Sequence, residues 1–176
     1  MSDPHPGSPG HHHRRDAPER VPTAIVTVSD TRSLDDDAGG ALVAELLEAG
    51  GHSIASRSIV RDEPEAIAAA LRDLVAREDV RAVVFTGGTG VAPRDVTPDS
   101  VEPLLERVLP GFGELFRMLS YEEIGSAALL SRALAGLVAG KVVFVLPGSR
   151  GAVRLGMQKL VVPELGHLAG EAVKTR

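Results

Sequence analysis

The sequence contains no cysteine and no tryptophan, and its 176 residues include only four Phe and one Tyr. The lack of Cys excludes disulfides, thiolate metal sites and a cysteine nucleophile. Because aromatic residues are so scarce, aliphatic side chains must build the hydrophobic core. The length is sufficient for one domain with such a core.

Long apolar runs and clusters of basic charge are also missing. No apolar run approaches the roughly 20 residues needed to span a bilayer, and the N-terminus lacks the apolar segment of a signal peptide. The formal net charge is −5, from 19 basic and 24 acidic residues, and no Lys/Arg run suggests a nucleic-acid track. We therefore expect a soluble cytoplasmic protein that contacts neither membranes nor nucleic acid.

Residues 1–22 are rich in Pro, Gly, His and charge and contain almost nothing apolar. Such a segment cannot offset the entropy of ordering, which predicts a disordered tail followed by a single domain over residues 23–176. His11, His12 and His13 could bind a metal ion adventitiously, but a solvated tail is the simpler interpretation.

The rest of the chain alternates between strand and helix patterns. β-branched apolar runs predict strands covered on both faces, and amphipathic stripes that begin near Pro or end at Gly predict helices. Strands are expected at 23–29, 52–60, 80–86 and 141–147, and helices at 41–51, 61–78, 97–108, 113–123 and 150–171, the last with a bend at Pro163. The break at Gly140-Lys141 predicts a hairpin that adds one antiparallel strand. The pattern as a whole predicts a doubly wound, mainly parallel α/β sheet.

In such sheets, ligands bind at the carboxyl ends of the strands. Four loops meet that description: "SDTRSLDDDAGG", "IVRDEP", "TGGTGVAPRDVTPDS" and "LPGSRGA". They place Ser29, Asp30, Asp62, Asp95 and Ser149 near one edge of the sheet.

The glycine-rich loop at 86–100 is the most unusual of the four. Its "GGTG" segment can adopt φ values closed to other residues and can bring backbone N–H groups close to a phosphate or a ring. It does not match a dinucleotide fingerprint, and the chain contains no G-x-x-x-x-G-K-[ST] P-loop. Taken alone, "GGTG" is interpreted as a glycine-rich turn.

Asp95 adds chemistry to this loop. A carboxylate beside Arg94, with Pro93 and Pro98 restricting the backbone, is suited to hold Mg²⁺ next to phosphate oxygens. The alternative is that Asp95 lies in a solvated turn, or that Asp95 or Thr97 caps the helix that follows, and that Asp62 only favours a helix start. Two carboxylates on neighbouring loops favour the functional interpretation.

Ser120, Ser131 and Arg132 could bind an anion through two hydroxyls and a guanidinium fork. The alternative for these three residues is hydrogen bonding at a helix surface and a strand end. His52 and His167 lie within segments with structural patterns and suggest no Ser-His-acid arrangement.

Five segments in order, "VTVSDTRS", "TGGTGVAPRDVTPDS", "PGFGELFRMLSYEEIG", "LLSRALAG" and "VLPGSRGAVRLG", resemble the MoaB/Mog family of molybdenum cofactor biosynthesis proteins, which includes the G domain of gephyrin. The resemblance covers residues 23–171 and is greatest to the MoaB branch. It implies a three-layer α/β/α domain that assembles into trimers or hexamers, with possible contacts to other cofactor-biosynthesis proteins.

Active members of the family are molybdopterin adenylyltransferases. The resemblance therefore implies Mg²⁺-dependent transfer of AMP from ATP to molybdopterin, with release of pyrophosphate. It places the two family aspartates at Asp62 and Asp95, as catalytic and metal-binding residues. The substrate-binding residues that we expect are Ser29, Asp30, Thr31, Gly87, Gly88, Thr89, Gly90, Arg94, Ser120, Ser131, Arg132, Pro147 and Gly148.

Two features qualify this expectation. Arg150 and Gly151 stand where the resemblance leads us to expect a Pro-Asn pair, which weakens the case for Ser149 and Arg150 as ligands. Some MoaB-branch proteins lack "RDVTP" and do not catalyse the reaction, whereas this sequence retains it. The alternative function is a non-catalytic molybdopterin carrier or assembly scaffold.

Overall fold

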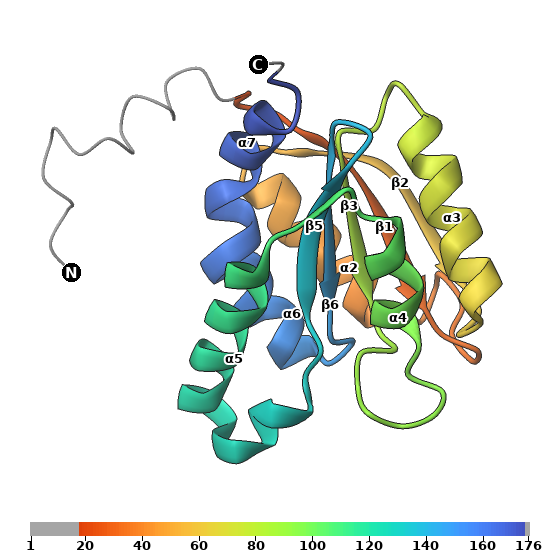
Figure 1. The fold of residues 1–176 in the computed structure, drawn as a ribbon, viewed down its shortest axis with the longest axis vertical. Coiled ribbons are helices and arrows are strands. Elements are labelled where there is room, and N and C mark those ends of the chain that lie inside the picture. Colours follow the sequence, from red (N-terminus) through yellow and green to blue (C-terminus); the bar gives the residue numbers. More distant parts are fainter. Residues whose placement is uncertain (1–17, 175–176) are drawn as a thin grey trace, which may run out of the picture.

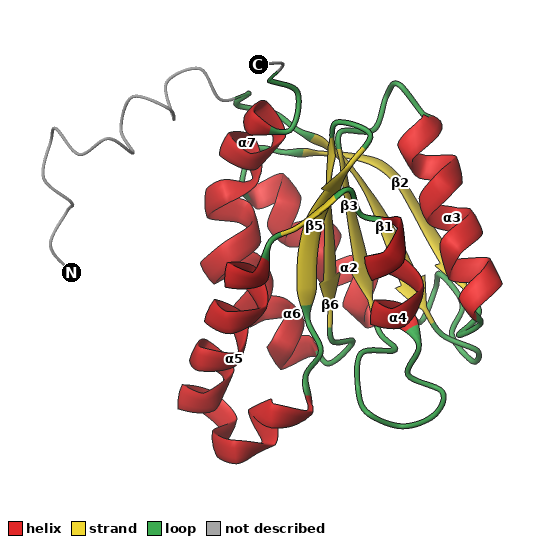
Figure 2. Cartoon of the chain, in the orientation of Figure 1, coloured by secondary structure: helices red, strands yellow, loops and turns green. Residues whose placement is uncertain are grey.

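Strands with continuous apolar sequences form the centre of the sheet. In the computed structural model, which describes residues 18–174, all residues of β3 and β6 and nearly all of β1 are buried. The six strands lie in the order β2-β1-β3-β6-β5-β4 (Figure 2). Their bounds are β1 Pro22–Val28, β2 Ser53–Val60, β3 Ala82–Thr86, β4 Arg107–Val108, β5 Leu134–Val138 and β6 Lys141–Leu146.

Helices cover both faces of this sheet (Figure 1). On one face lie α2 (Ala38–Ala49), α5 (Pro110–Ile124), α6 (Arg150–Gly156) and α7 (Val162–Glu171), and on the other lie α3 (Pro64–Ala76) and α4 (Thr97–Val101). Two apolar cores fill the spaces between the layers, one around Phe116 and Phe144 and the other around Phe85 and Ile67. The predicted three-layer α/β/α fold is confirmed. No helix in the described part of the chain has the length and apolar character needed to cross a membrane.

The predicted hairpin is present. β5 and β6 pair antiparallel around Ala139 and Gly140, whose φ angles of 49° and 68° suit the tight turns that join antiparallel strands. β1, β2, β3 and β6 are mutually parallel, and β4 pairs antiparallel with β5. β5 is therefore the one strand that runs against the others, as expected.

The predicted helix at 97–108 is wrong in its second half. Only Thr97–Val101 is α-helical, a short 3₁₀ turn follows at Glu102–Leu104, and Arg107–Val108 form the edge strand β4. Pro103 has no N–H to donate, so the α-helical hydrogen bond to the carbonyl oxygen of Asp99 cannot form at this position. The apolar spacing that suggested a longer helix instead places Leu105 against Gly136 of β5.

Several other boundaries also differ. α2 begins at Ala38 rather than at residue 41, because the Asp37 side chain caps it, and α5 begins at Pro110. The predicted C-terminal helix contains a π-helical turn at Met157–Val161, which ends two residues before Pro163. Val21 is buried, so the folded region begins before the predicted boundary at residue 22. The disorder expected for residues 1–17 lies outside the described residues.

Candidate functional site

The carboxyl ends of the parallel strands meet at one end of the molecule, and β3 lies at the centre of that end (Figure 1). The chain leaves β1 toward α2 and leaves β6 toward α6, which share one face of the sheet, whereas it leaves β3 toward α4 on the other face. The connection after β3 therefore leaves the sheet on the opposite face from the connections after its two neighbours, and α/β sheets bind ligands in the crevices that such a change of face creates. The structure has two cavities at this end of the sheet.

The first cavity, which we call the α5-side cavity, has a volume of about 310 Å³. The glycine loop and the loop after β6 form one wall, and α5 with the 3₁₀ turn that follows it at Gly125–Leu130 forms the other. Its lining is partly apolar, through Phe116, Ile124 and Leu130. The predicted residues that line it are Gly88, Thr89, Gly90, Asp95, Ser120, Ser131, Pro147 and Gly148.

The second cavity, the α2-side cavity, also has a volume of about 310 Å³ and is lined by residues from the ends of β1 and β3 and the start of α2. Of the predicted residues, Ser29, Gly87 and Gly148 line it. Gly148 and Ser149 line both cavities. The two cavities thus share a wall, and a ligand spanning both would pass Gly87 of the glycine loop and Gly148 of the loop after β6.

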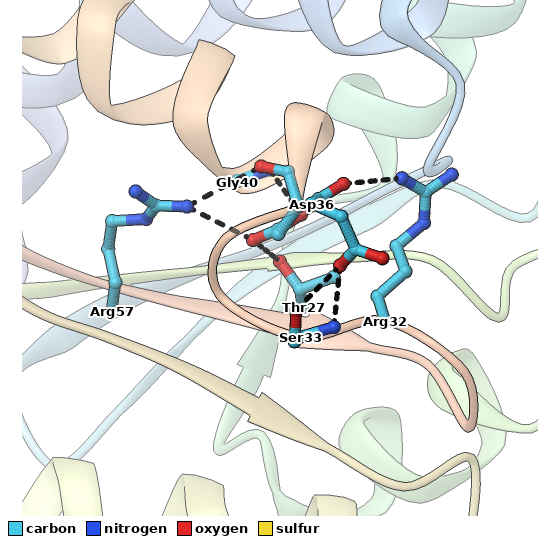
Figure 3. A network of polar contacts seen from close by, with 7 residues as sticks. Thr27, Arg32, Ser33, Asp36, Gly40 and Arg57 are labelled. Atoms are coloured by element: carbon cyan, nitrogen blue, oxygen red, sulfur yellow. Dashed lines mark hydrogen bonds and ion pairs between the residues drawn. The ribbon is translucent and has the colours of Figure 1, made fainter.

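The wall of the α2-side cavity is held by a polar network around the N-terminus of α2 (Figure 3). The buried Asp37 carboxylate accepts hydrogen bonds from Gly40 N at 2.9 Å and Thr27 Oγ1 at 2.8 Å, and it forms an ion pair with Arg57 at 3.3 Å. In the loop before it, Asp36 accepts from the backbone N–H of Ser33 at 2.6 Å. Asp37 therefore has a structural role in capping α2.

Two glycines at the end of β3 have conformations and surroundings that exclude a side chain. Gly87 has a φ of 98°, and an added Cβ would lie 2.5 Å from the carbonyl oxygen of Val28. Gly88 has a φ of 63°, and its Cβ would lie 2.3 Å from Thr97 Oγ1 and 3.0 Å from Asp62 Oδ1. Contacts this short require glycine at both positions. At Gly88 the backbone therefore approaches the Asp62 carboxylate closely.

Asp62 lies within a group of charges from three loops. Its backbone N–H donates to Asp30 Oδ1 at 3.3 Å, and the other oxygen of Asp30 is paired with Arg94. Burial raises the pKa of the Asp62 carboxyl, a hydrogen bond from the Val96 backbone lowers it, and the nearby charges of Asp30 and Asp95 raise it further. Asp62 Oδ1 is buried and has no hydrogen-bond partner in the protein. Such an atom is suited to bind a cation.

Asp95 is oriented by its own loop. Its Oδ2 accepts a hydrogen bond from Ala92 N at 2.9 Å, and the side chain lines the α5-side cavity. Neither Asp95 nor Thr97 caps α4, because the N-cap residue is Val96 and makes no side-chain cap. Asp62 likewise precedes the N-cap residue of α3, Glu63. The alternative that Asp95 or Thr97 caps α4 is therefore wrong, whereas Asp62 is close enough to α3 to favour its start by charge.

Five predicted residues line neither cavity: Asp30, Thr31, Asp62, Arg94 and Arg132. Asp30, Asp62 and Arg94 form the charged group beside the glycine loop. Thr31 lies in an exposed turn, where its N–H donates to Ser29 Oγ at 3.3 Å. The Arg132 guanidinium bonds to the glycine loop itself.

Some lining residues carried no signal in the sequence. Phe116, Ile124 and Leu130 look like ordinary core or surface positions of an amphipathic segment, so periodicity could not assign them to a cavity. Ser149, which the unexpected Arg150-Gly151 pair made doubtful, lines both cavities and caps α6 through the N–H of Ala152. The polar residues at strand ends were predictable because topology alone places them there.

The fold and the paired cavities define an α/β domain with a strand-end site for a small ligand. A family model described as a probable molybdopterin binding domain matches residues 24–167. Molybdenum cofactor biosynthesis protein B of Halalkalibacterium halodurans is 49% identical over 165 residues, covering 93% of this chain and 97% of that protein. The chain belongs to the MoaB/Mog family.

Solved structures agree with this assignment. The crystal structure of a molybdenum cofactor biosynthesis protein B superposes with a TM-score of 0.86 at 51% identity, covering 89% of this chain and 98% of that chain. The tungsten cofactor synthesizing protein MoaB from Pyrococcus furiosus gives a TM-score of 0.81 at 36% identity, covering 90% of this chain and 100% of that chain. The resemblance found in the five sequence segments is therefore confirmed at the level of family and fold.

Proposed function

We propose that this protein works in molybdenum or tungsten cofactor biosynthesis and transfers AMP from ATP to the terminal phosphate of molybdopterin. The broader role is supported by the family and by the names of its relatives. The observation that carries the specific reaction is the position of two carboxylates. An added Cβ at Gly88 would lie 3.0 Å from Asp62 Oδ1, and one at Gly90 would lie 2.6 Å from Asp95 Oδ2, so both carboxylates lie close to the backbone of the "GGTG" segment.

In the proposed reaction, a phosphate oxygen of molybdopterin attacks the α-phosphorus of ATP and forms the new P–O bond. The bond from that phosphorus to the bridging oxygen breaks, and pyrophosphate leaves with the electron pair. Both reactants are anions, so positioning and charge compensation are the main tasks of the protein. No covalent enzyme nucleophile is required, which agrees with the absence of Cys.

The residues at this site fit Mg²⁺. Asp62 Oδ1 is buried without a protein partner, and the charges of Asp30 and Asp95 add to the burial that raises the pKa of Asp62. Within residues 18–174, no three His, Asp or Glu side chains form a metal site by themselves. Mg²⁺ commonly binds one or two carboxylates together with substrate phosphates and water, and here Asp62 and Asp95 would hold it. The ion would offset the negative charge of the phosphates.

The two cavities suit different parts of the substrates. Phe116, Ile124 and Leu130 give the α5-side cavity an apolar wall for a flat heterocycle such as a pterin, and the Ser120 and Ser131 hydroxyls lie in the same lining. Gly87 and Gly148 separate this cavity from the α2-side cavity. We propose that the reacting phosphates meet at this glycine boundary, within reach of Asp95.

A turnover assay tests the proposal. Purified protein is incubated with molybdopterin and Mg·ATP, and adenylylated pterin and pyrophosphate are measured. Replacing Asp95 with Asn should lower kcat by about 100-fold or more. The neutral amide would hold Mg²⁺ less well than the carboxylate, so the negative charge of the reacting phosphates would be less well offset. Asp73→Asn, an exposed change on α3, is the matched control and should leave turnover unchanged.

Two results would contradict the proposed reaction: no product from the wild-type protein, or undiminished product from Asp95→Asn. Tight molybdopterin binding without Mg·ATP-dependent turnover would instead support the carrier or scaffold function. The apolar wall of the α5-side cavity is compatible with such binding. Absence of molybdopterin binding would exclude both functions.

A further inference from the structure

Arg132 is bonded at several points to the glycine loop, although it lies 42 residues beyond Gly90. Its backbone N–H donates to Thr89 O at 3.1 Å, and Nε donates to Gly90 O at 2.8 Å. Nη2 donates to the carbonyl oxygen of Asp95. Nη1 donates to both carboxylate oxygens of Asp99, at 2.9 and 2.7 Å. Every one of these acceptors belongs to residues 89–99.

These bonds occupy most of the guanidinium. The four side-chain bonds use four of the five N–H groups that an arginine carries, and Asp99 balances its positive charge. Arg132 therefore has little capacity left for a substrate phosphate unless it releases the loop. This placement differs from the direct anion-binding role that the sequence suggested.

Apart from Arg132, three interactions support the loop near Asp95. Residues 91–94 are exposed, Asp95 N donates to Ala92 O and Ala92 N donates to Asp95 Oδ2, both at 2.9 Å, and the exposed Arg94 side chain pairs with Asp30. Farther along, Thr97 N donates to Gly88 O at 3.0 Å. The planar guanidinium of Arg132 bonds to Gly90, to the main chain of Asp95 and to Asp99 of helix α4, and so connects these three parts of the loop rigidly.

We propose that Arg132 is a positioning residue that fixes the main chain at Gly90 and Asp95, so that the Asp95 carboxylate is held at the α5-side cavity, and that it does not bind substrate phosphate. The role of the held carboxylate rests on the proposed function. The bonds from Arg132 to the loop are present in the protein without ligands. The two can therefore be tested separately.

The first test measures the loop without substrates. Hydrogen exchange of the amides in residues 88–99 is followed in the wild type, Arg132→Lys and Asp99→Asn. Lysine keeps the charge but carries three N–H donors on a single nitrogen, so it cannot reproduce the four bonds that three arginine nitrogens make, and exchange in this segment should accelerate on the order of tenfold. Asp99→Asn keeps Nε and Nη2 in place and should give a smaller acceleration. Unchanged exchange in both variants would overturn the proposal.

The second test separates positioning from substrate binding. Displacing Asp95 should lower kcat of Arg132→Lys by on the order of 10- to 100-fold, with a KM for molybdopterin close to wild type. Asp99→Asn should change kcat in the same direction, but less. If Arg132 instead bound the substrate phosphate, Asp99→Asn would free its guanidinium and lower KM, and Arg132→Lys would raise KM; either KM change would overturn the proposal.

Arg77→Lys is the matched control. Arg77 forms an equivalent two-point pair with Asp79, at 2.9 and 2.7 Å, just beyond the C-terminal end of α3 and before β3 begins, at the opposite end of the sheet from the site. It should alter neither loop exchange nor kinetics. If the wild type shows no turnover, the adenylyl-transfer proposal fails while the exchange experiment still decides the role of Arg132.

Discussion

At the scale of single residues, Asp62 combines a stability cost with the metal-binding role proposed for it. Burial and the charges of Asp30 and Asp95 raise its pKa, which means that the folded state holds the Asp62 proton more tightly than the unfolded chain does. The stability contribution of this group is therefore full at pH values below the ordinary aspartate pKa and is lost as the pH rises through the raised pKa. At neutral pH the ionised carboxylate opposes folding.

Replacing Asp62 with Asn should therefore stabilise the protein and inactivate it. We expect the free energy of unfolding at pH 7 to increase by about 0.5–1 kcal/mol, as at other sites where function conflicts with stability. The gain should shrink as the pH falls through the raised pKa of Asp62, because the wild-type carboxyl then becomes protonated in the folded state. Urea unfolding at several pH values measures this effect, with Asp73→Asn as the exposed control. A variant less stable than the wild type at pH 7 would contradict the electrostatic interpretation.

The residue scale also shows where sequence reasoning succeeds. Asp62 and Asp95 follow strands that periodicity identifies, so their positions at the sheet edge are predictable from topology. The role of Arg132 was not, because its partners are mostly backbone carbonyls, which every residue carries. Only the tertiary structure shows which carbonyls lie within its reach.

At the scale of elements, the edge strand β4 is the main surprise. It contains two exposed residues, Arg107 and Val108, and pairs with Leu137 and Gly136 of β5. A segment of two residues is too short to show the alternation of apolar and polar residues that is typical of a strand, and the apolar residues before it match the spacing of a helix equally well. Pro103 supplied the one local signal that the helix ends early.

Gly136 permits this edge to form. An added Cβ there would lie 2.5 Å from Leu105 Cδ1 and 2.6 Å from the carbonyl oxygen of Arg107. Gly136→Ala should therefore displace β4 and lower the free energy of unfolding by about 1–3 kcal/mol. Gly111→Ala is the control, because no atom lies within 4 Å of its added Cβ in the first turn of α5. Equal stability of the two variants by thermal unfolding would show that β4 does not depend on this contact.

At the scale of the whole molecule, the distribution of apolar surface suggests self-association. α5 and the following 3₁₀ turn expose Met118, Tyr121, Ile124, Leu129 and Leu130, with Leu129 80% exposed. Clustered large apolar side chains on a surface commonly mark an interface. Together with the family resemblance, they support a homo-oligomer, which we propose is a trimer or hexamer.

Sedimentation velocity tests this proposal. The mass obtained for the wild type from its sedimentation should be three or six times the chain mass of 18.4 kDa. Leu129→Asp should shift the population toward monomer, because an interface core disfavours a charged side chain. Val173→Asp, a change at another exposed apolar residue, should leave the assembly intact. A monomeric wild type at micromolar concentration would contradict the oligomer.

The sequence by itself determined the parallel sheet, the hairpin and the carboxyl-end loops that carry Asp62, Asp95 and the glycines. It could do so because burial on both faces and turn chemistry leave local patterns in the chain. The tertiary structure alone decided that Gly88 lies against Asp62, that Phe116 and Leu130 wall a cavity, and that Arg132 holds the loop of Asp95. These contacts join segments far apart in the chain, and their distances depend on how the layers pack rather than on any local pattern.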